Sequence, residues 1–260
     1  MKLTPTFRLP WLPIRGALAC VLILLLAQLF AVASEARPPR DDPEAQKWLT
    51  EVWTHAKQRQ IEFKQIDGVT WVTMQPISGP KLGIYLSWIN AIRMVKENGQ
   101  WVVYYKVGGQ KDELWLCTAS ESYAQRFYQA LLYLTRESHQ AANTGNKAAL
   151  EKFKAQAEQW RALVVKPAMT EEAYKHKVLA EEAYRNKDLV KAWLEYEQAL
   201  QVFPTWPEGQ FNAALLNAEL EHYRGATFRM QEYLMLAPDA PDAQSARDKV
   251  IIWQDKVPRF

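Results

Sequence analysis

The sequence contains few of the residues that build disulfide frameworks, metal sites or common active sites. Of its 260 residues, two are Cys and four are His. The histidines, at positions 55, 139, 176 and 222, are scattered and form no HxxH or HExxH spacing. CxxC pairs, the G-x-S-x-G turn and phosphate-binding glycine loops are also absent from the sequence. We therefore expect no enzymatic activity, no metal site and no cofactor.

Long hydrophobic runs are also missing, except near the N-terminus. Residues 1–15 carry three positive charges and no negative one, and residues 16–32 contain no charged side chain. Ala31-Val32-Ala33 then forms an A-x-A pattern. This order predicts a secretory signal peptide, residues 1–33, cleaved after Ala33. The alternative is an uncleaved membrane anchor formed by residues 16–33. Either arrangement places the remainder outside the cytoplasm, in the periplasm if the source is a diderm bacterium.

Beyond that segment the chain has no excess of positive charge. It contains 32 basic and 29 acidic residues, and Lys2, Arg8 and Arg15 are the only charged residues before residue 34. Subtracting these three leaves 32 − 3 = 29 basic residues against 29 acidic ones. A nucleic-acid surface needs a basic stripe. We expect no nucleic-acid partner, and membrane association only through an uncleaved N-terminus.

The two cysteines predict no intramolecular disulfide. Cys20 lies in the N-terminal apolar run and would leave with a cleaved signal peptide, so Cys117 would have no intramolecular partner. Cys117 lies in the apolar run LWLC, which predicts a buried thiol. Aromatic residues are abundant instead, with eleven Trp, and they indicate well-filled cores.

Residues 34–60 combine a polar, proline-bearing tether with a helix. Asp42 is the expected N-cap and Pro43 the first helical residue. The helix is expected to end within residues 57–60.

Residues 61–139 change to the two-residue period of β-strands. Candidate strands cover residues 69–74, 84–95, 101–107 and 113–117. Asn98-Gly99 predicts a hairpin turn, because both residues tolerate positive φ. An amphipathic helix is expected over residues 123–137. The pattern indicates an α+β fold, with a small antiparallel β-barrel or sheet closed by a C-terminal helix.

These segments resemble the pleckstrin-homology-like barrel in their order. They read YLSWINAIRMV, WVVYYKV, DELWLCTAS and SYAQRFYQALLYL. The resemblance implies that the last helix plugs an open barrel end and that the domain binds phosphoinositides or proteins. Lipid-binding members carry a basic loop between early strands, whereas residues 75–82 here contain Lys81 as their single basic residue. We expect a folded spacer or docking module.

Residues 140–168 are predicted to form a connecting helix. The polar stretch 139–146 indicates a break, and residues 147–165 then carry an apolar stripe and end before Pro167. We expect this helix to pack on the following segment, where it could occupy a groove.

Residues 170–256 contain an internal repeat. Ala192 and Ala226 are separated by 226 − 192 = 34 residues, and Pro204 and Pro238 by 238 − 204 = 34. A fixed period of this size is typical of stacked helical hairpins. The pattern predicts five helices, so the chain should continue from the α+β domain into an all-α helical-hairpin array.

The repeat resembles the tetratricopeptide repeat, in two copies followed by a capping helix. The matching residues are Ala180, Ala192, Tyr196, Ala199 and Pro204 in the first copy, and Ala214, Leu220, Tyr223, Ala226 and Pro238 in the second. Departures from the pattern occur at His176, Gln210, Met230 and Tyr233.

Members of this family bind extended peptides or helices in the concave face formed by the first helix of each hairpin. The resemblance implies that a partner would contact Tyr174, Lys177, Glu181, Tyr184, Phe211, Asn212 and Leu215. Lys177 and Asn212 match two positions of a carboxylate clamp, whereas Glu181 replaces its Asn. In an alternative arrangement, Tyr174 and Phe211 pack against the connecting helix, which then fills the groove.

Two functions follow from these patterns. The first is a non-enzymatic, extracytoplasmic adaptor or scaffold that binds a protein or peptide partner through the repeats. The second is a lipid- or small-ligand-binding protein that uses the barrel, with the repeats for oligomerisation. Exposed aromatic residues at 174, 184 and 211 would favour the first function. A cavity lined by Trp71, Trp88 and Trp101 would favour the second. The sequence leaves the oligomeric state open.

Overall fold

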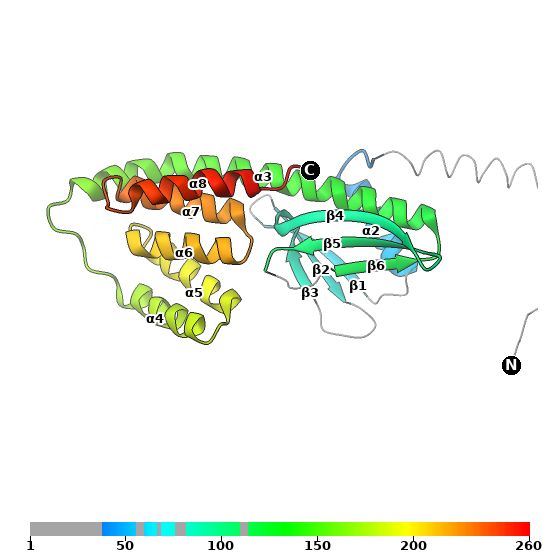
Figure 1. The fold of residues 1–260 in the computed structure, drawn as a ribbon, viewed down its shortest axis with the longest axis horizontal. Coiled ribbons are helices and arrows are strands. Elements are labelled where there is room, and N and C mark those ends of the chain that lie inside the picture. The colour runs from blue at the N-terminus through cyan, green and yellow to red at the C-terminus, as the bar shows by residue number, and fades with distance from the viewer. Residues whose placement is uncertain (1–37, 56–59, 67–68, 76–81, 110–113) are drawn as a thin grey trace, which may run out of the picture.

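A computed structural model describes residues 38–55, 60–66, 69–75, 82–109 and 114–260. The expected signal peptide and the Lys81 loop lie outside the described residues. The fold is mixed α+β and elongated (Figure 1). A half that contains the strands and a half that contains only helices lie side by side along one long helix.

The chain enters the first half through α2 (Asp42–His55). The Oδ1 atom of Asp41 accepts a hydrogen bond from the backbone N–H of Glu44 at 2.9 Å, so Asp41 caps the helix one residue before the expected Asp42. Trp48, Leu49 and Val52 recur at helical spacing and are buried.

The strands form two separate antiparallel sheets. The first has the order β1 (Gln60–Ile66), β2 (Val69–Gln75) and β3 (Leu82–Tyr85). The second has the order β4 (Ile89–Glu97), β5 (Gln100–Val107) and β6 (Leu114–Thr118). The short 3₁₀ helix η1 (Leu86–Trp88) leads from one sheet to the other.

The expected barrel is therefore wrong for the described residues, whose strands close no barrel. The single strand expected over residues 84–95 is interrupted by η1, which directs the chain into a second sheet. The expected turn at Asn98-Gly99 is confirmed, because both residues have positive φ, 49° and 79°, between the paired β4 and β5. Cys117 is half-buried, and its thiol lies 2.8 Å from the Oε1 atom of Gln100. The expected fully buried thiol is therefore wrong.

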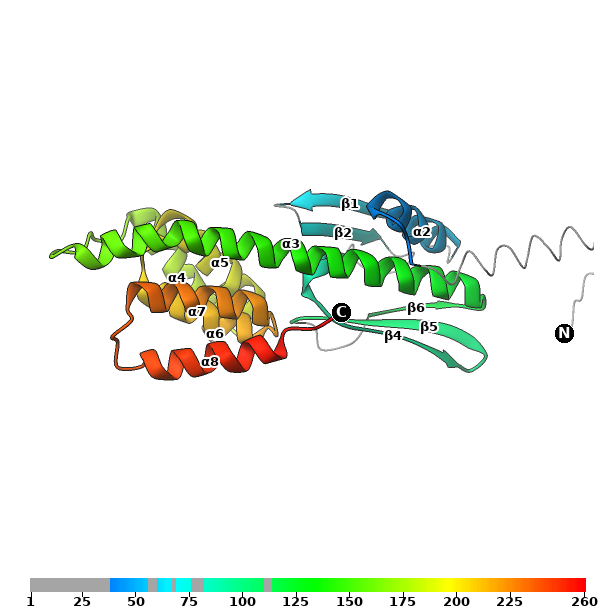
Figure 2. The ribbon, with the colours of Figure 1, turned by 90° about the horizontal axis from the view of Figure 1, so that it is seen from above.

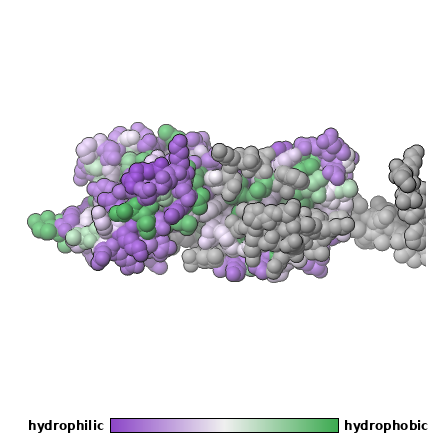
Figure 3. Space-filling view, turned by 90° about the horizontal axis from the view of Figure 1, so that it is seen from below, coloured by the Kyte–Doolittle hydropathy of each residue, from purple (hydrophilic) through white to green (hydrophobic). Residues whose placement is uncertain are grey.

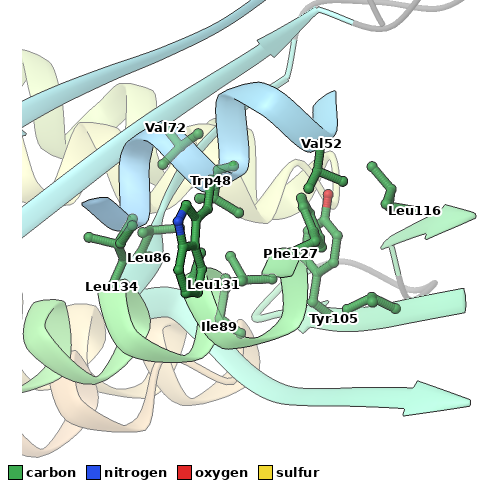
Figure 4. Close-up of a cluster of buried hydrophobic side chains, with 14 of the residues drawn as sticks. Trp48, Val52, Val72, Leu86, Ile89, Tyr105, Leu116, Phe127, Leu131 and Leu134 are labelled. Carbon is green, nitrogen blue, oxygen red and sulfur yellow. The ribbon is translucent and has the colours of Figure 1, made fainter. Parts of the chain in front are cut away.

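Helix α3 (Glu121–Ala162) passes over both sheets and continues along the helical half (Figure 2). Ser120 caps its start, where its side chain accepts the N–H of Tyr123. Phe127, Leu131 and Leu134 pack into a core with residues from α2 and from strands of both sheets (Figure 4). At 42 residues, α3 is about 63 Å long.

The break expected over residues 139–146 is wrong, because α3 continues through it without interruption. Gln140, Asn143 and Thr144 are exposed, which accounts for much of the polar composition of the segment, whereas His139 is buried. The expected connecting helix is thus the second half of α3.

The helical half comprises α4 (Glu171–Arg185), α5 (Leu189–Val202), α6 (Pro207–Glu219), α7 (Tyr223–Leu236) and α8 (Ala243–Lys256). α4 packs on α5, and α6 packs on α7. The two tight turns match one another: Lys187 and Glu221, 34 residues apart, have positive φ values of 61° and 59°. Ala180, Ala192 and their counterparts Ala214 and Ala226 are fully buried.

Candidate functional site

Three of the residues expected to bind a partner meet in one hollow between α4 and α6. Tyr184, Asn212 and Leu215 line a space of about 230 Å³, together with Tyr196, Leu216 and Glu219. The Nδ2 atom of Asn212 donates to the Tyr196 hydroxyl at 3.5 Å, which orients the amide. Tyr184 is 51% exposed and Leu215 is 38% exposed, so both side chains are accessible.

The remaining expected residues lie outside this hollow. Tyr174 is 57% exposed, in a shallow depression on α4 that also includes Val178. The ammonium group of Lys177 lies 3.9 Å from the carboxylate of Glu181 and 5.7 Å from the ring centre of Trp206. Its charge already has these partners, which makes it a poor clamp for a terminal carboxylate. Phe211 packs on Tyr233 with ring centres 5.1 Å apart, inside the second hairpin.

Helix α3 lies on the other side of the helical array. Its residues Phe153, Ala157 and Trp160 form a buried cluster with Leu236 of α7. The Arg161 side chain also donates a hydrogen bond to the carbonyl of Met235, at the end of α7. The α4 side chains Tyr174 and Tyr184 remain open to solvent, with hydrophobic surface visible among hydrophilic residues on the underside of this half (Figure 3).

A second concave site lies at the junction of the two halves, where aromatic rings form a continuous chain. Trp71 of β2 contacts Tyr85 of β3, with ring centres 4.7 Å apart. Tyr85 contacts Trp88 of η1 at 5.1 Å, and Trp88 contacts Trp193 of α5 at 5.0 Å. His222 stacks on Trp88, with ring centres 4.0 Å apart and planes inclined by 29°.

These rings line a cleft of about 390 Å³, which lies within the range of small-molecule sites. The cleft is lined by Trp71, Ile84, Tyr85, Trp88, Val107, Gly108, Gly109, Val190, Trp193, Leu194, Leu220 and His222. Two of the three Trp expected to line a cavity, Trp71 and Trp88, are therefore present. Trp101 is not in this lining; it lies at the start of β5, with the Lys96 ammonium 5.3 Å from its ring centre.

Two buried histidines hold the junction together. The Nδ1 atom of His139 accepts from Arg224 at 2.9 Å, which leaves its Nε2–H to donate to the Ile89 carbonyl at 3.1 Å. The Nε2 atom of His222 lies 3.3 Å from the Gly108 carbonyl, as a donor. Burial lowers the pKa of His222 to about 4, and burial together with the positive charge of Arg224 lowers the pKa of His139 to about 4. Both rings are therefore neutral at neutral pH.

Polar contacts from the α6–α7 turn add to this junction. The Lys106 ammonium lies 3.5 Å from the Glu221 carboxylate, and the Asn90 amide donates to the Glu221 carbonyl at 3.3 Å. Glu221, which has a positive φ in the tight turn of the second hairpin, is therefore also one of the residues that join the two halves.

Sequence reasoning did not identify Tyr85, Trp193 or His222 as site residues. They belong to β3, α5 and the α6–α7 turn, and no local spacing relates them; only tertiary packing brings them together. Among the described residues, no three His, Cys, Asp or Glu side chains are grouped closely enough to hold a metal ion. No helix in the described part of the chain has the length and apolarity to cross a membrane. No protein-family model, curated protein or solved structure matches this chain.

Proposed function

We propose that the protein is a non-enzymatic, extracytoplasmic adaptor that binds a protein or peptide partner through a short tetratricopeptide array formed by α4–α7. The supporting observation is the open hollow between α4 and α6. Tyr184, Asn212 and Leu215 line it, Tyr174 lies exposed further along α4, and α3 packs on the opposite side against α7. Exposed aromatic and aliphatic side chains in a concavity are typical of peptide-binding surfaces.

Co-purification of the full-length protein from its own cells tests this proposal. We expect envelope proteins recovered with the native chain to be lost from a Tyr174→Ala/Tyr184→Ala variant, which removes two exposed rings without opening the core. An Ile251→Ala/Ile252→Ala variant is a matched control, because these exposed side chains lie on α8. Partners retained by the tyrosine variant, or lost equally from both variants, would exclude the hollow as the binding surface.

A second candidate function is binding of a lipid or small ligand in the strand-containing half, with the helices serving for oligomerisation. The observation that favours it is the junction cleft, which is lined by Trp71 and Trp88 among other residues and has a volume of about 390 Å³. The cleft belongs to both halves, so a ligand there would contact α5 as well as the strands.

A further inference from the structure

The junction cleft combines aromatic rings with a lining that, among the residues the structure describes, carries no charged side chain. Three Trp and one Tyr contribute to its wall, and the other lining residues are aliphatic or glycine apart from His222. Burial holds His222 neutral at neutral pH, with a pKa of about 4. The described lining therefore offers an anionic ligand no cation to pair with.

Successive rings along this wall are steeply inclined to one another. The interplanar angle is 67° between Trp71 and Tyr85, 53° between Tyr85 and Trp88, and 80° between Trp88 and Trp193. Rings inclined steeply to one another turn their faces in different directions, so together they can bound one space on several sides, as the walls of a box do. Aromatic boxes of this kind attract cations, because each ring face carries the negative part of its quadrupole, and Trp is the strongest of the three aromatic residues.

The mouth of the cleft selects among cations. Val190 and Leu194 of α5 are each 48% exposed there, so an entering group meets aliphatic side chains as well as rings. A primary ammonium would lose strong hydrogen bonds to water on entering and would gain none from these side chains. A quaternary ammonium has no N–H to satisfy, and its methyl groups suit an aliphatic surface.

We propose that the junction cleft binds a quaternary ammonium group, with Trp71, Tyr85 and Trp193 as the principal rings around it. This inference rests on the second candidate function. The group could be carried by a free solute such as choline or by a phosphatidylcholine headgroup. Trp88 supports the box by linking Tyr85 and Trp193, and its stack on His222 fixes its position.

Calorimetric titration of the full chain with choline and with 3,3-dimethyl-1-butanol tests the charge preference. The two molecules have the same shape, but only choline is cationic. We expect choline to bind at least about tenfold more tightly, since cation–π contacts are absent for the neutral isostere. Equal binding of both would overturn the quaternary ammonium inference while leaving ligand binding in the cleft intact. Binding of neither, together with no retention on vesicles, would overturn both.

Phosphatidylcholine and phosphatidylglycerol vesicles separate the two sources of the group. Binding of free choline with no preference between vesicles indicates a soluble ligand. A preference for phosphatidylcholine vesicles indicates the lipid headgroup. Either result supports binding of a quaternary ammonium group in the cleft.

Variants locate the binding in the cleft. Trp71→Leu removes one ring at a position away from the His222 stack, and we expect choline affinity to fall about tenfold, with Trp71→Phe intermediate. Trp101→Leu is the matched control, because it removes a half-buried Trp of the same half outside the cleft lining. Equal choline affinity in Trp71→Leu and the native chain, with both folded by circular dichroism, would contradict the assignment.

Discussion

At the scale of single residues, two departures from the repeat pattern are accommodated by hydrogen bonds. Gln210 is fully buried, and its side-chain amide donates to the Pro204 carbonyl at 2.8 Å. The Nδ1 atom of His176 lies 2.7 Å from a carboxylate oxygen of Glu195. Buried polar groups persist in proteins where they find such partners. Polar residues at expected apolar positions are therefore compatible with close packing of these hairpins.

Gly108 lies where the two halves approach so closely that a side chain would not fit. A Cβ atom at this position would lie 2.6 Å from the His222 ring and 2.9 Å from the Leu220 carbonyl oxygen. The carbonyl belongs to backbone and cannot move cheaply, so we expect Gly108→Ala to lower the free energy of unfolding by about 1–3 kcal/mol. Chemical denaturation measures this change. An unchanged stability would show that the two halves do not touch here in solution.

His222 should make stability depend on pH. Its pKa is about 4 in the folded chain and about 6.5 when unfolded, so the unfolded state binds more protons as the pH falls from 6.5 toward 4. The neutral ring thus contributes stability that is complete above pH 6.5 and lost on acidification. We expect a loss on the order of 1–3 kcal/mol between pH 7 and pH 4.5 from this residue.

His222→Gln isolates that contribution. A Gln amide can still donate to the Gly108 carbonyl but cannot take up a proton. Denaturation of both chains at pH 7 and pH 4.5 should give a smaller acid-induced loss for the variant. The other buried groups, including His139 beside Arg224, remain in both proteins and cancel in the comparison. Equal losses would mean that His222 is not buried as a neutral ring.

At the scale of elements, the middle of α3 offers a glycine whose replacement by Ala should raise stability, in contrast to Gly108→Ala. Gly145 lies inside the helix, and a Cβ atom there would meet nothing within 4 Å. Replacing an exposed helical Gly by Ala removes its entropic cost, so Gly145→Ala should raise the free energy of unfolding by about 1 kcal/mol. Thermal or chemical denaturation checks this. A destabilised variant would indicate that the helix is broken near this residue, as the polar sequence alone predicts.

The elements that sequence predicted well are those whose signals are local. The five helices expected from the 34-residue period are the five that the structure shows, α4–α8. Thr170 supplies a local start signal, since its side chain accepts the N–H of Ala173 at the beginning of α4. The hairpin turn at Asn98-Gly99 was also predicted from local sequence, because these two residues tolerate positive φ. The barrel was wrong because closure depends on pairing between distant strands, which spacing does not encode. Continuity of α3 depends on packing at both of its ends, which outweighs the weak helix preference of the intervening segment.

At the scale of the whole molecule, α3 is the helix that the two cores have in common among the described residues. Phe127 and Leu134 belong to the core that α3 forms with α2 and the two sheets, and Phe153 and Trp160 pack on α7. The same arrangement determines where the concave sites lie. The α4–α6 hollow is open because α3 binds the opposite side, and the aromatic cleft exists because the α6–α7 turn meets the strands. Neither relation could be predicted from residue spacing, since both depend on how the halves are docked.

Because one helix contributes to both cores, we expect the two halves to unfold together. Hydrogen exchange of the native chain should give similar opening free energies for the slowest amides of β5 and α7. Trp160 is 9% exposed and packs against Phe203 with ring centres 6.0 Å apart. Trp160→Ala should cost about 3 kcal/mol and reduce protection in α7 more than in β5, because it detaches α3 from one core only. Different opening free energies for β5 and α7 in the native chain would contradict this coupling and identify the junction as a hinge between independently stable halves.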